Sequence, residues 1–530
     1  MAKIHNHGQA GSQGCSCCSE GLRAAWAAAV KAGVSRRNLL VGAGTAAVGS
    51  WLAGARSVAV AADQPAASQP AIAPARELIV QPVLVYALPQ RREQTSWRSW
   101  GGLQTAEQVE AEAKRIGEEL AKLIETTGPA IRFLPLARVQ TAAEAAAVQQ
   151  QPFDVMLIYA AGGWAPFLDT LAKPDRPNLV FLRHRSGPVY LWYETLHPVW
   201  MRKGSDRYVV KGLDVRDVVV DEYADLAWRL RALLALRKTL GQRIVALGGP
   251  MGWGDGMKLA PPIARDKWHL DIRTVSYDDL HKRIEQLKND ASAVSEARKQ
   301  AADYLAGPKV SLHADRKYLD NAMLLCRAFK DMMAEHDAKA FTIGNCMSTV
   351  MPISETTACM PLSLLNDEGY MAFCESDFVV IPSGILMHHL MGTPVFLNDP
   401  TWPHHGVVTL AHCTAPRKMN GRDFEPVKIY THFESDYGAA PKVEMAKGQE
   451  VTVVVPDFEC RKWVGAKGTI EANPFLDICR SQIDVAIAGD CQKLVEDMRG
   501  FHWMLAYGDC RREVGYAIKH LGIEWQDVSA

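Results

Sequence analysis

The feature that most constrains the fold is an alternation, from residue 77 onward, of short apolar runs with segments of helical periodicity. The apolar run Leu78–Tyr86 is followed by a segment in which Val109, Ile116, Leu120 and Leu123 recur at helical spacing. Thr105 and Gln108 form a capping-box pattern before this segment. Such alternation is typical of βαβ units around a parallel sheet, so the sequence predicts an α/β fold.

We expect two α/β domains of this kind, at residues 77–240 and 241–400. A long helix over Asp221–Leu240, ended by Gly241, closes the first domain. An apolar strand at Arg243–Leu247, followed by a Gly-Gly-Pro turn, opens the second. With 530 residues the chain is too long for one ordinary core, which agrees with a division into domains.

The last third of the chain has a different character. Strand-like runs follow one another with few helical segments between them, at Val407–Ala411, Val427–Phe433, Val451–Val455 and Gln482–Ala488. A helix around Arg511–Leu521 closes the chain. We therefore expect a β-rich, barrel-like C-terminal domain over residues 401–530.

The N-terminal segment is predicted to be an export signal and not part of the fold. The sequence Ser35-Arg36-Arg37-Asn38-Leu39-Leu40 opens an apolar run that reaches Ala55, and Ala59-Val60-Ala61 supplies small residues for cleavage. This pattern predicts a twin-arginine signal at 1–62 and a linker at 63–76. The run of 17 residues is short for a stable membrane span, although an uncleaved anchor is the alternative. We expect export by the Tat machinery to the periplasm or the exterior.

Charge and cysteine content narrow the classes of function. Lys+Arg and Asp+Glu both number 59, so no basic excess points to a nucleic-acid partner. Of twelve cysteines, Cys15, Cys17 and Cys18 lie before the predicted cleavage point and receive no role in the mature protein. The other nine form no CxxC pair, so a disulfide framework is not expected. Because the Tat route exports folded proteins, folding in a reducing cytoplasm would leave them as thiols.

The densest polar signal is Cys374-Glu375-Ser376-Asp377, between an apolar strand and an apolar helix. The carboxyl end of a strand is where α/β folds place their ligands. Two carboxylates in such apolar surroundings are costly unless they are paired, protonated or bound to a cation. Glu375 and Asp377 are therefore candidate ligands of a hard divalent ion, the alternative being that they cap the following helix.

These residues belong to a set of motifs that resembles the L-fucose/L-arabinose isomerase-like family. The motifs are Asn366–Gly369, Cys374–Asp377, His389–Pro400, Ala411–Cys413, His432–Ser435 with Gly438, and Phe501–Trp503 with Tyr507–Asp509. The resemblance is specific over residues 340–530. Before that it is weaker, with Gly248-Gly249 ahead of Trp253 as the best marker.

The resemblance implies two Rossmann-like domains followed by a β-rich domain, in a homo-oligomer. It also implies a metal site with Glu375, Asp377 and His502 as ligands, and Glu355 as a further acid upstream. The metal would be Mn²⁺, with Mg²⁺ or Co²⁺ as alternatives. The implied reaction interconverts an aldose and a ketose, with Glu375 and Asp377 as catalytic carboxylates. Phe501 departs from the family pattern, which has Asn before the histidine, and the family's known isomerases are cytoplasmic.

Two further residues are candidates for contact with a sugar. Trp402 offers an aromatic face suited to sugar C–H surfaces, and His412 lies in the His-Cys motif. His404-His405 resembles a metal motif, but a surface loop is the default interpretation. His388 and His389 are interpreted as packed helix residues. A metal-dependent hydrolase or lyase on the same scaffold, and a non-catalytic sugar-binding protein, are the alternative functions.

Overall fold

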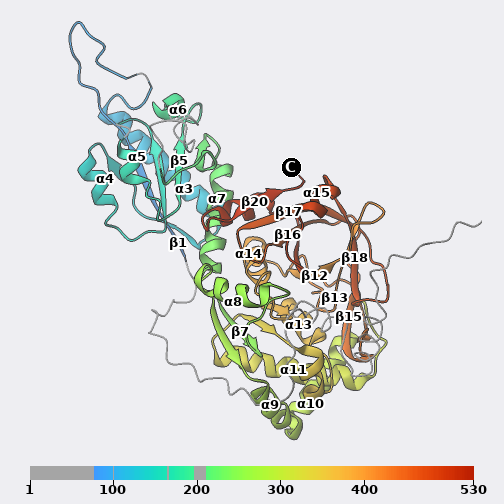
Figure 1. The fold of residues 1–530 in the computed structure, drawn as a ribbon. Helices are drawn as coiled ribbons and strands as arrows, with labels where there is room; N and C mark the ends of the chain where they lie inside the picture. Colours follow the sequence, from blue (N-terminus) through green and yellow to red (C-terminus); the bar gives the residue numbers. More distant parts are fainter. Residues whose placement is uncertain (1–76, 100, 164–165, 196–210, 530) are drawn as a thin grey trace, which may run out of the picture. The chain divides into compact units, whose positions relative to one another are not determined.

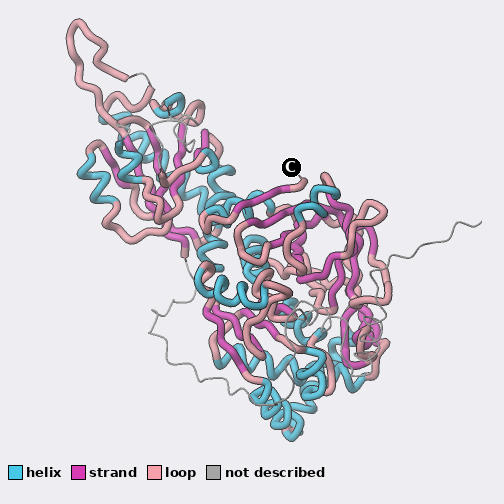
Figure 2. Tube along the Cα trace, in the orientation of Figure 1, coloured by secondary structure: helices cyan, strands magenta, loops and turns pink. Residues whose placement is uncertain are grey.

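The computed structural model describes residues 77–99, 101–163, 166–195 and 211–529 (Figure 1). The predicted signal at 1–62 and the linker at 63–76 lie outside these residues. Helices and strands alternate through the first two thirds of the described chain, and strands dominate the last third (Figure 2). The structure confirms the predicted α/β fold with a β-rich C-terminal part, which is a closed antiparallel barrel.

The first sheet is parallel and has the order β2-β1-β4-β5-β6, with β3 also pairing with β1. Its strands are β1 (Leu78–Val85), β2 (Ile131–Phe133), β3 (Ala137–Val139), β4 (Val155–Ala160), β5 (Asn178–Leu182) and β6 (Val218–Val220). The connecting helices include α3 (Ala106–Thr127), α4 (Ala142–Val148), α5 (Pro166–Leu171) and α6 (Trp192–Thr195). The predicted capping box is present, because Thr105 and Gln108 satisfy each other's backbone N–H groups at the start of α3.

The second sheet is also parallel, in the order β11-β10-β7-β8. Its strands are β7 (Arg243–Leu247), β8 (Asp271–Val275), β10 (Ala340–Ile343) and β11 (Met371–Cys374). Its helices include α8 (Gly256–Asp266), α9 (Tyr277–Asn289), α10 (Ala291–Ala306), α11 (Arg316–Glu335), α12 (Met351–Ser354), α13 (Cys359–Asp367) and α14 (Ile381–Met391). Pro382 is tolerated because it lies in the first turn of α14, where no intrahelical N–H is lost.

The barrel runs β16-β19-β12-β13-β18-β17 and closes because β17 pairs with β16 (Figure 1). Its strands are β12 (Phe396–Pro400), β13 (Val408–His412), β16 (Glu450–Pro456), β17 (Lys462–Ala472), β18 (Ser481–Ile487) and β19 (Trp503–Tyr507). Val453, Val464 and Ile483 are among the buried residues that fill the barrel core. β20 (Glu524–Asp527) adds to β17 in parallel, after α15 (Cys491–Asp497) and α16 (Arg511–Lys519).

A small third sheet packs beside α11 and α13. It consists of β14 (Val427–His432), β15 (Tyr437–Val443) and β9 (Val310–Leu312), and β9 pairs in parallel with β14. A β-bulge between Tyr430 and His432 interrupts the β14–β15 ladder. The end of β14 lies near the N-terminus of α13, since a ring nitrogen of His432 is within 4.8 Å of Cys359 Sγ.

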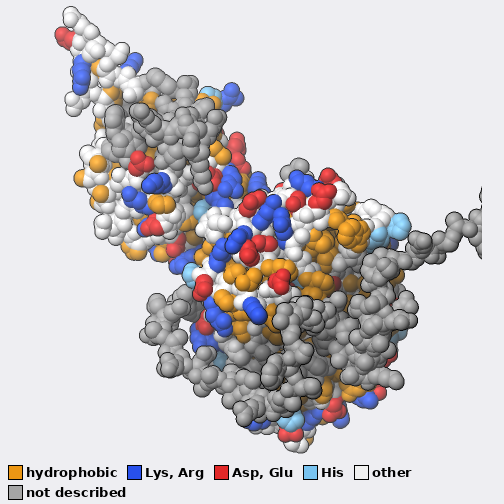
Figure 3. All heavy atoms as spheres, in the orientation of Figure 1, with side chains coloured by type: hydrophobic (Ala, Val, Ile, Leu, Met, Phe, Trp, Pro, Cys, Tyr) orange, Lys and Arg blue, Asp and Glu red, His pale blue; other side chains and the backbone are white. Residues whose placement is uncertain are grey.

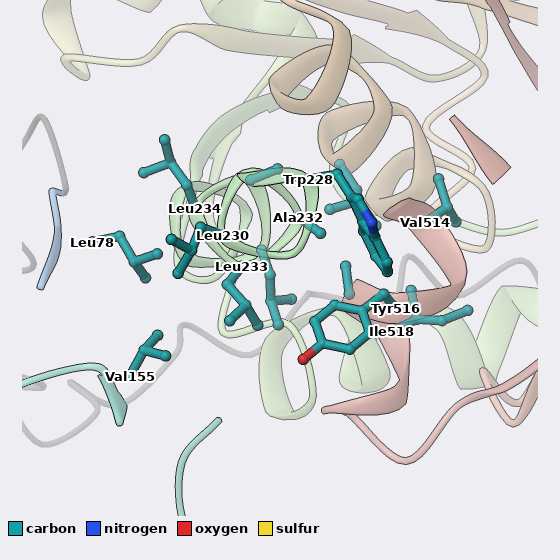
Figure 4. Close-up of a cluster of buried hydrophobic side chains, with 14 of the residues drawn as sticks. Leu78, Val155, Trp228, Leu230, Ala232, Leu233, Leu234, Val514, Tyr516 and Ile518 are labelled. Atoms are coloured by element: carbon teal, nitrogen blue, oxygen red, sulfur yellow. The ribbon is translucent and has the colours of Figure 1, made fainter. Parts of the chain in front are cut away.

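Helix α7 (Tyr223–Thr239) is buried on nearly all sides, which explains why its sequence is apolar around its circumference. In Figure 4, Leu230 and Leu234 lie on the side of Leu78, whereas Trp228 faces Tyr516 of α16. The rings of Trp228 and Tyr516 meet edge-on at a centroid distance of 5.3 Å. α7 therefore shares one core with the first sheet and with the C-terminal helix.

Acidic and basic side chains alternate over the described part of the face drawn in Figure 3, in keeping with the balanced composition. Among the described helices, none is both long enough and apolar enough to cross a bilayer.

Candidate metal centre

Glu375 lies in an unusual turn immediately after β11. Glu375 and Ser376 both adopt left-handed backbone conformations, with φ of 62° and 47°. Each such residue other than glycine costs roughly 1 kcal/mol or more. The turn is held by the loop after β7, because the Met251 N–H donates to the Ser376 carbonyl and the Phe378 N–H donates to the Met251 carbonyl. This strained turn presents Glu375 and Asp377 at the carboxyl edge of the second sheet.

His502 comes from the barrel and meets Asp377. Its Nδ1 lies 2.7 Å from Asp377 Oδ2, and both side chains are buried. The other oxygen of Asp377 accepts the Val379 N–H at 3.0 Å. Residues 125 positions apart are thus joined by a short hydrogen bond across the second sheet and the start of β19.

The opposite nitrogen of His502 faces two more carboxylates. Nε2 lies 3.1 Å from Asp399 Oδ1 and 3.4 Å from Glu375 Oε2. Asp399 is placed there by strand pairing, because β12 lies beside β19 with Asn398 opposite Trp503. The barrel therefore contributes both an imidazole and an acid to the site.

His412, a predicted sugar-contact residue, lies at the same place. Its Nε2 is 3.7 Å from Glu375 Oε1, and its Nδ1 is 3.1 Å from the Thr414 hydroxyl. When Nδ1 donates its proton to Thr414, Nε2 presents its lone pair toward Glu375. β13 pairs with β12, with Ala411 opposite Asp399, which sets His412 next to the other groups.

The electrostatics of the cluster favour a cation. Burial by itself lowers the pKa of His502, but the hydrogen bonds with Asp377, Asp399 and Glu375 outweigh it and hold that pKa well above its usual range. Three carboxylates surround this imidazole, so negative charge remains in excess even when His502 is protonated. A divalent ion would neutralise this excess.

The geometry also fits an ion. Ligand atoms of Asp399, His412 and His502 all lie within 4.8 Å of one another. Ligands about 2.1 Å from a central ion are separated by roughly 3 to 3.5 Å, close to the contacts around His502 Nε2. The Nε2 atoms of both histidines are buried, and each faces a carboxylate oxygen of the cluster. These residues could therefore hold a metal ion.

Asp377 lies on the other side of the His502 ring from the remaining side chains of the cluster. It contacts Nδ1 of His502, whereas Glu375, Asp399 and His412 gather at Nε2. A carboxylate on the far nitrogen fixes the ring and raises the basicity of a ligating histidine. Asp377 is therefore placed to orient the ring of His502. Asp399 lies where a metal ligand would lie, although the sequence did not single it out. The sequence signal for Asp399 was its place near the end of a strand, within the 389–400 motif.

An aromatic pair lies against the cluster. The Trp253 indole N–H donates to Glu375 Oε2 at 3.2 Å. The same indole stacks on Phe501, with ring centroids 4.0 Å apart and an interplanar angle of 10°. Phe501 therefore supports the residue that orients Glu375.

Other predicted residues lie apart from these contacts. Glu355 forms an ion pair with Lys288 at 2.6 Å, and its side chain is 60% exposed. Trp402 is 75% exposed in the loop between β12 and β13, and its carbonyl contacts His404 Nδ1. His388 and His389 lie in the last turn of α14.

The chain was compared with models of known protein families and matched none, and a comparison with curated proteins likewise gave no match. The functional assignment therefore rests on the geometry of the cluster.

Proposed function

We propose that this protein is a metal-dependent sugar isomerase that interconverts an aldose and a ketose, with Mn²⁺ as the ion. The observation that carries the proposal is the convergence of Glu375, Asp399, His412 and His502 from two sheets. Mixed carboxylate and imidazole ligands suit Mn²⁺, with Mg²⁺ or Co²⁺ as alternatives. A hydrolase or lyase would use the same ligands, so the reaction assay must separate these outcomes.

The chain's own residues suit a proton transfer between neighbouring carbons. The bound ion would polarise a sugar carbonyl and acidify the adjacent hydroxyl. Glu375 is the candidate base: its carboxylate takes the proton from C2 and returns it to C1, while the O2 hydroxyl proton passes to O1. Trp253 orients this carboxylate through its N–H, and Asp377 holds His502 in place. Glu375 and Asp399 are partly exposed whereas His502 is buried, so a sugar would approach the cluster from the side of these two carboxylates.

The test uses the mature chain, stripped of metal and then given Mn²⁺. Pentoses and 6-deoxyhexoses are incubated in ²H₂O, and exchange at C2 and isomer formation are followed by NMR. We expect both to depend on Mn²⁺, and to be lost in His502→Ala and Glu375→Gln. His405→Ala changes an exposed loop histidine and is the matched control. Full turnover in His502→Ala would overturn the proposal, and bond cleavage without isomerisation would favour a hydrolase or lyase.

We also propose that the protein is exported through the Tat machinery. The twin arginines, the short apolar run and the small-residue cleavage pattern support this location. Replacing Arg36 and Arg37 together by Lys should stop accumulation in the periplasmic fraction while the cytoplasmic precursor rises. Unchanged periplasmic accumulation of the double variant would contradict the assignment.

A further inference from the structure

A second group of metal-binding side chains lies outside the cluster around His502. Cys359, Cys413 and His432 are all buried, and their ligand atoms lie within 4.8 Å of one another. The Cys413 thiol is also hydrogen-bonded to the thiols of Cys359 and Cys479. Two sulfur atoms and one imidazole thus meet at one place, with the Cys479 thiol beside Cys413. None of these residues contributes to the proposed isomerase chemistry.

The four residues come from four separate elements that converge. Cys359 begins α13, Cys413 follows β13, His432 ends β14, and Cys479 lies in the loop before β18. Since the residues are up to 120 positions apart (359 to 479), only the tertiary fold assembles them. Such convergence differs from a chance pair of neighbouring cysteines along the chain.

Hydrogen bonds fix the backbone that carries the group. The Thr357 hydroxyl donates to the Ala439 carbonyl at 3.0 Å, which ties the start of α13 to β15. The fully buried Gln482 donates to the carbonyls of Leu476 and Cys479, both at 2.9 Å, and accepts the Leu476 N–H. The loop that bears Cys479 is therefore held in place by the fold itself, as a preformed site requires.

Arg480 supplies positive charge beside the sulfurs. Its backbone N–H donates to Cys413 Sγ at 3.4 Å, and its guanidinium reaches the carbonyl of Thr431, next to His432. Three thiolates and a neutral imidazole around a divalent ion carry a net charge of minus one. The N–H group and the guanidinium would stabilise that charge, as outer contacts do in thiolate metal sites.

We propose that Cys359, Cys413, Cys479 and His432 form a second metal site, which binds a tetrahedral, thiolate-preferring divalent ion of the zinc class. A Cys₃His set is one of the ordinary structural zinc sets. With zinc–sulfur bonds of about 2.3 Å, sulfur atoms in a tetrahedral shell lie roughly 3.8 Å apart, which is inside the 4.8 Å limit that holds for Cys359 and Cys413. Binding releases the thiol protons to solvent, and no other reactant is needed.

The position of the second site gives it a structural role. His412 and Cys413 are successive residues, so one belongs to the carboxylate–imidazole cluster and the next to the thiol group. An ion bound to Cys413 would anchor the end of β13 behind His412. The site does not depend on the proposed isomerase activity, because its ligands are a separate set.

The experiment measures metal content and cobalt spectra of the mature chain prepared under reducing conditions. We expect about one equivalent of tightly held zinc. Replacement by Co²⁺ should give a thiolate-to-cobalt charge-transfer band in the near ultraviolet. Both signals should persist in His502→Ala, which disables the other cluster. They should be lost in Cys413→Ser, and Cys479→Ser should lower Co²⁺ affinity by about 10-fold or more.

Cys326→Ser is the matched control, since Cys326 is a buried thiol of α11 in another part of the core, and both signals should remain. If Cys413→Ser does not fold, Cys479→Ser decides the question, because Cys479 is only half-buried in a loop. Absence of the charge-transfer band from the reduced native chain would overturn the proposal. So would retention of the band in Cys479→Ser with undiminished affinity, or a mass showing that Cys359 and Cys413 are joined as a disulfide in the native protein.

Discussion

Asp377 and Asp399 contact opposite nitrogens of the His502 ring and therefore have different roles. Asp377 is almost fully buried and divides its oxygens between His502 Nδ1 and a backbone N–H. Asp399 lies at Nε2, where Glu375 also lies and where solvent reaches the cluster. The first therefore orients the ring, and the second stands where a cation would bind.

This division predicts different losses of affinity for Mn²⁺. Asp399→Asn removes a charged oxygen from the cluster and should weaken binding more than Asp377→Asn, for which a loss of about 10- to 100-fold is expected. Isothermal titration calorimetry of both variants measures the difference, and Asp303→Asn on exposed α10 is the control. Undiminished affinity in Asp399→Asn together with lost affinity in Asp377→Asn would reverse the two roles.

His389 gives a prediction about pH. Burial, followed by the positive charges of His388 and Lys238, lowers the pKa of His389 to about 3. In the unfolded chain the pKa is about 6.5, so between these values the unfolded state binds a proton that the folded state does not. Stability contributed by neutral His389 is therefore present above pH 6.5 and is lost as the pH falls toward 3.

His389→Gln should accordingly reduce the fall in unfolding free energy between about pH 6.5 and pH 4. Urea unfolding at several pH values measures this slope. The exposed His281 of α9, replaced by Gln, is the control and should leave the slope unchanged. Equal slopes in the wild type and His389→Gln would contradict the prediction.

At the scale of elements, the approach of the β14–β15 hairpin to α13 depends on a glycine. Gly438 has φ of +73°, and a Cβ placed on it would lie 2.5 Å from the backbone nitrogen of Thr357. Gly448 has a similar φ of +77°, with nothing within 4 Å of the corresponding position. Both glycines need a left-handed backbone, but only Gly438 also lies too close to a neighbouring segment for a side chain to fit.

Gly438→Ala should therefore destabilise the protein more than Gly448→Ala. The left-handed conformation costs each alanine about 1 kcal/mol or more, and the clash at Gly438 adds to this because backbone atoms cannot simply move aside. Denaturant unfolding of the two variants measures the difference. If both variants lost the same stability, the close contact between the hairpin and α13 would be refuted.

Particular elements show how far the sequence determined the fold. α14 was predictable despite Pro382, because an apolar run with an early proline and Gly392 after its last residue obeys local rules. β17 was not predicted, since glycines interrupt its pattern. A Cβ on Gly465 would lie 2.1 Å from the Trp525 ring, so the glycine is required because a side chain distant in sequence packs against it. Such tertiary causes leave no local signal.

The candidate cluster, like the fold, was predictable only in part. Glu375 and Asp377 stood out as polar residues in apolar surroundings, whereas His502 was singled out only by a resemblance to a family motif. Asp399 was not singled out, because its role depends on β12 lying between β13 and β19. The choice of nitrogen on His502 that each acid contacts is a property of side-chain geometry, which residue spacing does not encode.

At the scale of the whole molecule, barrel closure determines which chain segments meet. β12 and β13 follow the second sheet in sequence, and β19 returns from near the C-terminus to pair with β12. Closure of the barrel therefore brings His502 beside Glu375 and Asp377, although these residues are far apart in the sequence. The first sheet is connected to helix α16 in a different way, through the buried carboxylate of Asp217.

Asp217, immediately before β6, accepts hydrogen bonds from two residues of α16. The Tyr516 hydroxyl donates to Asp217 Oδ1 at 2.7 Å, and the Lys519 ammonium donates to the same oxygen. Asp217 is 3% exposed, and Lys519 has Asp214 as a second partner at 3.1 Å. Removing the charge of Asp217 leaves the shape of the contact but weakens its bond to a buried ammonium.

Asp217→Asn should lower the stability of this connection by about 2 kcal/mol, the usual range for a hydrogen bond with a charged partner, because Asp214 still neutralises Lys519. The measurement is hydrogen exchange of the amides in β5, β6 and α16, because it reports the stability of this connection locally. Their protection should fall together, whereas amides of the barrel strands β12 and β13 should keep theirs. Asp303→Asn, in an exposed pair with Lys299, is the control and should leave protection unchanged. Unchanged protection of β6 and α16 in Asp217→Asn would mean that the apolar contacts of α7 alone join the first sheet to the C-terminal helix.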